Sequence, residues 1–340
     1  MGATTRKPSL REVSDAAPII ATGCTARLDS QGDFALEGCR EMPAGVQITN
    51  SEGLQIRVAR GIHCTLPVRG LYKLKPSAKI WSFTTVIHLE EGSSLEYVDE
   101  YFGTGSTACT VQAATRITLE AGAKLKYQAI LQWPEGVQSK HTQVFNVGRD
   151  ATLEVTPILL GGLQTHLTTE SHCLGKGSSI QISGAAKGKN KQTFEFDIIT
   201  EHSVTDTKST FDYLTVMGDQ SKAVFNGLIR ILQSGARTDA YQKSKNLLLS
   251  PQATIEAFPK LEIATDDVKV AHGASISPVN PDQIYYLQSR GISALEAETM
   301  IIDGFTEPVL TRLTEVFDLK SRVSTALVGA PIGSPREFAT

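Results

Sequence analysis

The sequence of 340 residues lacks the features of membrane-bound, secreted and nucleic-acid-binding proteins. No apolar run reaches the roughly 18 residues that a membrane-spanning helix needs. The start, MGATTRKPSLREVSDAAP, has no apolar signal core, and Arg6 stands where a myristoylation motif requires Ser or Thr. The formal net charge of −3 gives no electrostatic reason to expect a nucleic acid or a membrane surface as partner. We therefore predict a cytoplasmic protein that binds neither.

Cysteine is scarce, and its spacing argues against two common uses of the residue. The cysteines are odd in number and form no CxxC pair, which argues against a disulfide framework and a zinc knuckle. The pairs His63-Cys64 and His172-Cys173 would point their side chains to opposite faces of a strand, so neither is a natural chelate. We expect structural cysteines in these pairs rather than metal ligands. The five cysteines are Cys24, Cys39, Cys64, Cys109 and Cys173.

Helical patterns are missing between about residue 40 and residue 275, and a repeat takes their place. An apolar step is followed by a Gly, Asp or Ser turn, a small residue and then alternating apolar residues. The small residues are 30, 28, 27, 43 and 32 positions apart along the chain. The repeats are LEEGSSLEY, LEAGAKLKY, VGRDATLEV, LGKGSSIQI, MGDQSKAVF and LLSPQATIEA, aligned on Ser93, Ala123, Ala151, Ser178, Ser221 and Ala253.

Alternation with period two predicts strands, and a period of this length predicts stacked units. We predict a mainly β protein, a β-solenoid of parallel sheets with about nine coils and a length of about 40 Å. The interval of 43 leaves room for an extra or irregular strand pair. A large antiparallel sandwich is the alternative. The expected regions are a poorly ordered segment 1–30, the solenoid core 31–278, a helical segment 279–328 and a flexible tail 329–340.

The chain changes character after Pro278, where helical signals begin. One helix is expected from Pro281 to near Gly291, and a second starts after Ser293 with Glu296 in a capping box. EPVLTRLTEVF and LKSRVSTALV predict further helices. An apolar stripe at helical spacing is normally core, but so short a block has little core of its own, so part of the stripe is expected to contact another protein. The stripe consists of Ala297, Met300, Ile301 and Phe305.

Residues 246–305 carry a dense set of motifs: NLLLS, PKLEI, DDVK, HGA, YLQSRGIS and MIIDGF. Together they resemble the C-terminal signature of the SufB/SufD family of iron–sulfur cluster assembly proteins. A weaker likeness runs back to about residue 80 and includes LQWPEG at 131–136. The resemblance implies a right-handed parallel β-helix followed by C-terminal helices. Compared with many members of the family, this sequence is expected to lack a long helical N-terminal region.

The resemblance implies partners as well as a fold. Members dimerise through the C-terminal end of the β-helix, and the following helices dock SufC, an ABC-type ATPase. This sequence has no GxxxxGK[ST] loop, so we expect it to bind no nucleotide and ATP hydrolysis to come from the partner. His272 matches the histidine of SufD-type members near the cluster site, whereas Leu287 replaces a SufB-type cysteine. The chain is therefore SufD-like, although a self-sufficient homodimeric scaffold for a transient iron–sulfur cluster remains an alternative.

His272 can also be interpreted from its strand. Val268, Val270 and His272 share one face if the chain bends near Asp266 and Asp267, and two valines on that face predict a desolvated position. Burial favours the neutral imidazole that iron ligation requires. The alternative is a histidine that only fills a core or an interface. The other histidines, for which we expect structural roles, are His63, His88, His141, His166, His172 and His202.

The remaining candidate residues form three groups, and we expect no catalytic residue in the strict sense. A carbohydrate-active β-helix enzyme is a remote alternative, since no carboxylate cluster repeats across successive coils. A purely structural protein is another. The candidates are Asp266, Asp267, Lys269 and Gly273 for the dimer interface, where Gly273 lets a backbone approach closely; Tyr286, Arg290, Met300, Ile301 and Phe305 for ATPase docking; and Gln132 and Trp133 for a sulfur path.

Overall fold

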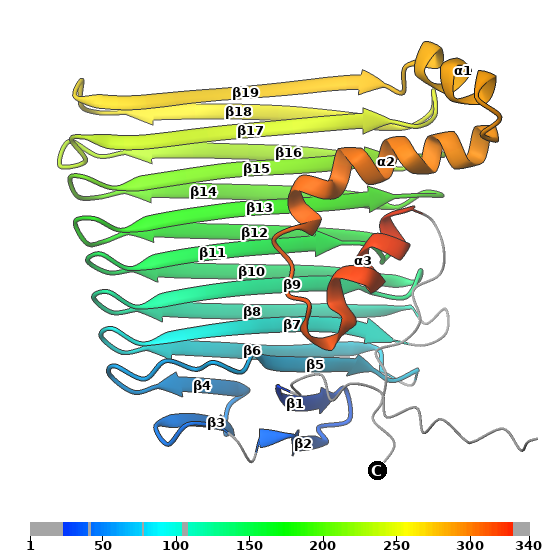
Figure 1. Cartoon of the computed structure of the whole chain (residues 1–340). Helices are drawn as coiled ribbons and strands as arrows, with labels where there is room; N and C mark the ends of the chain where they lie inside the picture. The colour runs from blue at the N-terminus through cyan, green and yellow to red at the C-terminus, as the bar shows by residue number, and fades with distance from the viewer. Residues whose placement is uncertain (1–22, 40–41, 77, 104–107, 329–340) are drawn as a thin grey trace, which may run out of the picture.

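The computed structural model describes residues 23–39, 42–76, 78–103 and 108–328, which form two parallel sheets lying face to face and three α-helices (Figure 1). In the described residues one sheet has ten strands and the other nine. In spatial order the ten-stranded sheet contains β19 (Val268–Pro278), β17 (Thr238–Leu248), β15 (Lys208–Met217), β13 (Ser179–Gly188), β11 (Thr152–Leu159), β9 (Lys124–Gln132), β7 (Ser94–Gly103), β5 (Val68–Leu74), β1 (Cys24–Asp29) and β2 (Phe34–Glu37). The nine-stranded sheet contains β18 (Thr254–Ile263), β16 (Lys222–Ile231), β14 (Thr193–His202), β12 (Gln164–Cys173), β10 (Val137–Val147), β8 (Cys109–Leu119), β6 (Ile80–Leu89), β4 (Leu54–Val58) and β3 (Val46–Asn50).

Each coil of the chain contributes one strand to each sheet, so the predicted parallel β-solenoid is confirmed and the antiparallel sandwich is excluded. The register between coils runs without a slip, for example from Ser179↔Lys208 to Gly188↔Met217 in β13 and β15. Alternate residues point into the tube, as in β14, where Phe194, Phe196 and Ile198 are buried. The period of two seen in the sequence therefore follows from side chains that point alternately into the tube and away from it.

The small residues of the repeat stand at the turns before the strands. Thr207, which is fully buried, continues the ten-stranded column after Ser178, and the interval between them is 29 residues. Ser221 instead precedes β16 in the other sheet, so the interval of 43 combines one whole coil with half of the next. The expected extra strand pair is therefore wrong. Ser221 before β16 and Ala253 before β18 are small and buried, like the repeat residues before strands of the ten-stranded sheet, so the sequence alone did not separate the two sheets.

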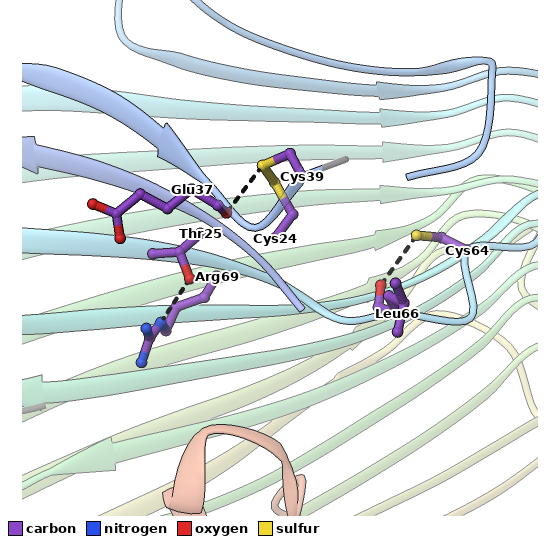
Figure 2. The surroundings of a disulfide bond; sticks show 7 residues. All are labelled: Cys24, Thr25, Glu37, Cys39, Cys64, Leu66 and Arg69. Atoms are coloured by element: carbon purple, nitrogen blue, oxygen red, sulfur yellow. Dashed lines mark hydrogen bonds between the residues drawn. A yellow bond between two sulfur atoms is a disulfide. The ribbon is translucent and has the colours of Figure 1, made fainter. Parts of the chain in front are cut away.

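The N-terminal end of the tube is closed by antiparallel strands. β2 pairs antiparallel with β1, and β3 pairs antiparallel with β4. A disulfide between Cys24 and Cys39 joins the start of β1 to the segment after β2 (Figure 2). Sequence spacing did not reveal this bond, because only the β1–β2 pairing brings the two cysteines together. β1 lies within the range 1–30, whereas residues 1–22 and the tail 329–340 lie outside the described residues.

The C-terminal segment contains α1 (Pro281–Ser289), α2 (Ala294–Leu310), a 3-10 turn (Val316–Asp318) and α3 (Leu319–Val328). Both predicted starts are confirmed: Asn280 caps α1 ahead of Pro281, and Ser293 forms a capping box with Glu296. The segment EPVLTRLTEVF is not a separate helix, since its first four residues end α2. Figure 1 shows α2 and α3 lying across one face of the tube, and contacts place α2 on β13 and β15 of the ten-stranded sheet.

A buried ion pair fastens α3 to the tube. The Arg322 guanidinium donates to Glu100 Oε1 at 2.6 Å, and the two side chains are 14% and 3% exposed. Arg69 lies 3.9 Å from the same carboxylate and stacks on the Phe317 ring at 4.4 Å. Because a buried carboxylate needs a cation near it, this cluster selects one position for the end of the helical segment.

We predict that Arg322→Ala destabilises the chain by about 3 kcal/mol, because Glu100 then loses its closest cation in a buried place. Urea unfolding followed by circular dichroism measures the change. Arg230→Ala is the matched control, since it breaks only solvent-accessible ion pairs, with Glu262 and Glu201, and should change stability by less than about 1 kcal/mol. Equal effects of both substitutions would contradict the assigned role of the Glu100 cluster.

Candidate functional site at the C-terminal end of the tube

The two ends of the tube differ in how their edge strands are satisfied. At the N-terminal end the antiparallel strands β2 and β3 close the sheets. At the C-terminal end β18 and β19 are the last strands of their sheets, and each pairs along only one edge within the described residues. These strands are 10 and 11 residues long. Long unpaired edges expose a full row of backbone donors and acceptors, so a strand of another chain could pair with an edge at this end of the tube.

His272 lies in the inward-facing row of β19. It stands in register with Gln242, which is buried, and Val268 and Val270 belong to the same row. The shared face predicted from the sequence is therefore present, and the turn between β18 and β19 contains Asp266 and Asp267 as expected. The predicted burial is wrong for the isolated chain, because His272 is exposed. No coil follows β19, so nothing in the described chain covers the inward row.

Gln242 lies directly beneath this opening in the adjacent coil. Its side chain is 2% exposed, yet its amide Nε2 has no hydrogen-bond partner. The amide reaches across the tube to Gly227 of β16, where a Cβ atom would collide with Nε2. Gly227 thus makes room for the glutamine, in register with Pro259 of the last coil. A buried amide without a partner carries a desolvation penalty, and a ligand acceptor at the opening would remove it.

The four residues proposed for the interface all lie at this end of the tube. The carbonyl of Asp267 accepts from the Arg237 backbone N–H, which ties the last turn to the coil below. Lys269 is exposed and in register with Asp239. A Cβ built at Gly273 would meet nothing within 4 Å, so the close backbone approach that we expected does not occur within the chain. That space remains open to a partner.

The five docking candidates are divided between surface and core. Tyr286 is 57% exposed and Met300 51%, whereas Ile301 and Phe305 pack against the buried cluster of Val216, Leu247 and Ile302. Part of the predicted stripe is core and part is exposed, because the angle at which α2 lies on β13 and β15 decides which side chains it buries. Arg290 donates to the Tyr286 hydroxyl and lies over its ring. The buried residues of α2 are Ala297, Ile302, Thr306, Val309 and Leu310.

Comparison with known proteins supplies the family. Residues 74–305 match the profile described as "SUF system FeS cluster assembly, SufBD core domain", and this range covers most of the chain. The chain belongs to the SufBD core family. No helix in the described residues is long and apolar enough to cross a membrane.

Two relatives in this family are named iron–sulfur cluster assembly protein SufD. The protein of Escherichia coli K12 is 29% identical over 230 residues, which is 67% of this chain and 54% of the relative. The protein of Bacillus subtilis 168 is 29% identical over 266 residues, covering 77% of this chain and 60% of the relative. A SufBD family protein of Staphylococcus saprophyticus is 27% identical over 267 residues, 77% of this chain and 57% of the relative. The chain thus spans little more than half the length of these SufBD relatives.

Gln132 and Trp133, proposed for a sulfur path, lie apart from the open end. β9, which ends at Gln132, is five strands from β19 in the sheet order, or about 24 Å. Trp133 is 3% exposed and donates from Nε1 to His141 Nε2 at 3.0 Å. Trp133 is therefore buried and Gln132 only partly so, and the structure does not bring either residue together with His272.

A buried acid in the same region was missed by sequence reasoning. Asp99 accepts hydrogen bonds from the hydroxyls of Tyr97, Tyr101 and Tyr127. Burial raises the pKa of Asp99 to about 6, although the three hydroxyls oppose the shift. Tyr97 and Tyr127 occupy the same repeat position in register, so LEY and LKY in the sequence were a signal for stacked tyrosines.

The three free cysteines of the described chain offer no reactive thiolate. Cys64, Cys109 and Cys173 are buried. Burial raises the pKa of all three thiols, that of Cys173 to about 12. Because the thiolate is the nucleophilic form, none of these residues is suited to accept sulfur in this state.

We predict that His141→Gln makes stability less sensitive to acid. Burial lowers the pKa of His141 to about 3, so between about pH 6.5 and 3 the unfolded chain binds a proton that the folded chain does not. The contribution of His141 to the free energy of unfolding is fully present above pH 6.5. It is lost as the pH falls below that value, by about 1.4 kcal/mol per pH unit. Glutamine keeps an oxygen acceptor for Trp133 and removes that slope.

Urea unfolding at pH 7, 6 and 5 measures the slope for the native chain and the variant. His63→Gln is the control, since His63 is exposed and its removal should leave the slope unchanged. If His141→Gln and the native chain lost stability in parallel, His141 would have to be protonated in the folded state.

Proposed function

We propose that the chain is a subunit of a SUF-type iron–sulfur cluster assembly complex that works through its open C-terminal end. In this proposal the end pairs with a second SufB/SufD-type subunit, His272 lies at the site of the nascent cluster, and the C-terminal helices dock a SufC-like ABC ATPase. The cluster is the cargo of the protein. Family membership and the names of the relatives support the assembly role.

The observation that carries the proposal is the position of His272 over Gln242 at an end that the chain does not cover. An exposed imidazole offers a nitrogen lone pair, and histidine replaces cysteine as a ligand in some iron–sulfur centres. The unpartnered Gln242 amide offers a hydrogen-bond donor one coil below, and hydrogen bonds to sulfur are one way in which proteins tune such clusters. The site thus combines a ligand for iron with a donor for sulfide.

Pairing of the open ends would complete this site. Two subunits related by a twofold axis can join edge strands antiparallel, each using the same surface. Ile263 is 43% exposed and Ile276 45% exposed, both in the inward rows of the last coil, so a partner would bury them. The same step would remove water from His272. Because the surface is available to a copy or to a relative, a homodimeric scaffold is the second candidate.

The C-terminal helices supply a separate docking surface. Tyr285 is 74% exposed, Leu295 76% and Met300 51%, and these residues belong to α1 and α2, as does Tyr286. Large apolar side chains that gather on one short helical segment favour a protein contact. An ATPase bound there would adjoin β19 directly, since α1 begins three residues after that strand ends. Movement of the ATPase would therefore act on the paired edge.

We predict that His272→Ala abolishes cluster assembly by the complex while leaving the fold intact, since His272 is exposed and touches no core. Anaerobic reconstitution with iron, sulfide and the ATPase, followed by visible absorption, measures the loss. His63→Ala is the matched control, an exposed histidine beside the other end of the tube. Undiminished cluster formation by His272→Ala would remove the residue from the site.

We predict that Ile276→Asp turns the dimer into a monomer, because a carboxylate in the inward row of β19 would be buried without a cation on pairing. Light scattering after gel filtration measures the mass. Ile80→Asp is the control. Ile80 is 72% exposed at the start of strand β6, away from the open end, so its substitution should leave the dimer unchanged. If the native chain is a monomer at micromolar concentration, the same measurement is made on a mixture with a SufB-like partner. Failure of the two proteins to form a complex would refute the interface.

A further inference from the structure

A second cluster of ligand-type side chains lies on the outward face of the nine-stranded sheet, away from the open end. His166 of β12 stands in register with Glu195 of β14, and Thr168 stands in register with Asp197. Both strands are flanked by further strands on either side, so their backbones are fixed by hydrogen bonds along both edges. The side chains of His166, Glu195 and Asp197 are partly buried. Two adjacent strands thus hold one imidazole and two carboxylates at neighbouring positions on a rigid sheet surface.

The distances among these groups suit a shared cation. His166 Nε2 lies 2.6 Å from Asp197 Oδ2, and one ligand atom from each of the three residues lies within 4.8 Å of the others. A metal ion about 2.1 Å from each donor needs separations of about 3 to 4 Å, which the flexible Glu195 side chain can reach. Asn226 of β16 donates from Nδ2 to Asp197 Oδ1 at 2.9 Å and so orients the other carboxylate oxygen toward His166. Such outer hydrogen bonds hold metal ligands in place.

The charges of the cluster are unbalanced. Three other carboxylates of this sheet and its turns pair with arginines: Glu90 pairs with Arg57, and Glu201 and Glu262 share Arg230. Glu195 has no ion pair or hydrogen bond with another described residue, and Asp197 has only His166 and Asn226. Lys140 of β10 is in register with His166 but is exposed and forms no ion pair with either acid in the described chain. The two carboxylates therefore have one imidazole near them and no lysine or arginine partner in the described chain, and a cation would balance their charge.

We propose that His166, Glu195 and Asp197 bind one divalent transition-metal ion. The neutral imidazole supplies Nε2 and the two carboxylates supply oxygen, with the metal taking the place of the proton between His166 and Asp197. Mixed nitrogen and oxygen donors without thiolate select ions such as Zn²⁺, Co²⁺, Fe²⁺ or Mn²⁺. Because the cluster is on the opposite sheet from His272, the proposal does not depend on the proposed function of the open end.

Titration of the full chain with Co²⁺ under anaerobic conditions tests the site, with ligand-field absorption and equilibrium dialysis as readouts. We expect one equivalent to bind in the native chain and in His272→Ala. His166→Ala and Asp197→Asn should each lose most of the affinity, and Asn226→Ala, which removes the orienting amide, should weaken binding about 10- to 100-fold. Circular dichroism of each variant checks that the partly exposed substitutions leave the fold intact.

His88→Ala is the matched control on the same face of the same sheet. His88 pairs with Glu120 at 2.9 Å but belongs to no group of three ligand atoms in the described residues, so its removal should leave Co²⁺ binding unchanged. Absence of Co²⁺ binding by the native chain would show that a proton alone bridges His166 and Asp197, and would overturn the proposal. Binding that survives His166→Ala but disappears in His272→Ala would overturn it as well, while supporting the function proposed for the open end.

Discussion

Main-chain hydrogen bonding between successive coils is the constraint on which the rest of the structure depends. Each strand in the middle of a sheet satisfies its N–H and C=O groups on both edges, and the register continues without a slip from coil to coil. The hydrogen-bond ladder ends at the first and the last coil, and the edge strands are treated differently at these two ends. The N-terminal strands turn back antiparallel, whereas β19 ends in a helix that leaves its edge open. The candidate site lies at the C-terminal end, where the backbone groups on the free edge of β19 have no partner strand in the described chain.

The interior shows the same difference between its two halves. Around Asp99 every tyrosine hydroxyl that points into the tube finds an acceptor, and Gln143 donates to Tyr127 in turn. Closer to the open end the buried Tyr213 hydroxyl and the Gln242 amide have no partner in the described chain. The satisfied network fixes the side chains around Asp99, while the unpartnered groups retain hydrogen-bonding capacity. The coils nearest β19 are therefore the part of the interior that can respond to a ligand.

Local patterns in the sequence predicted most of the fold, and long-range contacts account for what they missed. Alternation and turn spacing identified the strands, and Asn280, Ser293 and Glu296 located two helix starts because capping depends on neighbouring residues. The Cys24–Cys39 bond depends on the β1–β2 pairing, and the buried side of α2 depends on how that helix lies on two strands. Neither arrangement is encoded within a window of a few residues. The cluster of His166 with Asp197 likewise requires the register of two coils.

The exposure of His272 is the most informative of these failures. Alternation correctly assigned the residue to the inward row, but an inward position means burial only where another coil follows. The chain thus encodes an inward-facing imidazole and omits the layer that would cover it. Covering the end would remove water from His272 and favour the uncharged ring, the form with a lone pair for a metal. Under the proposed function, subunit pairing would create the ligand environment, and a movement that opens the interface would release whatever is bound there.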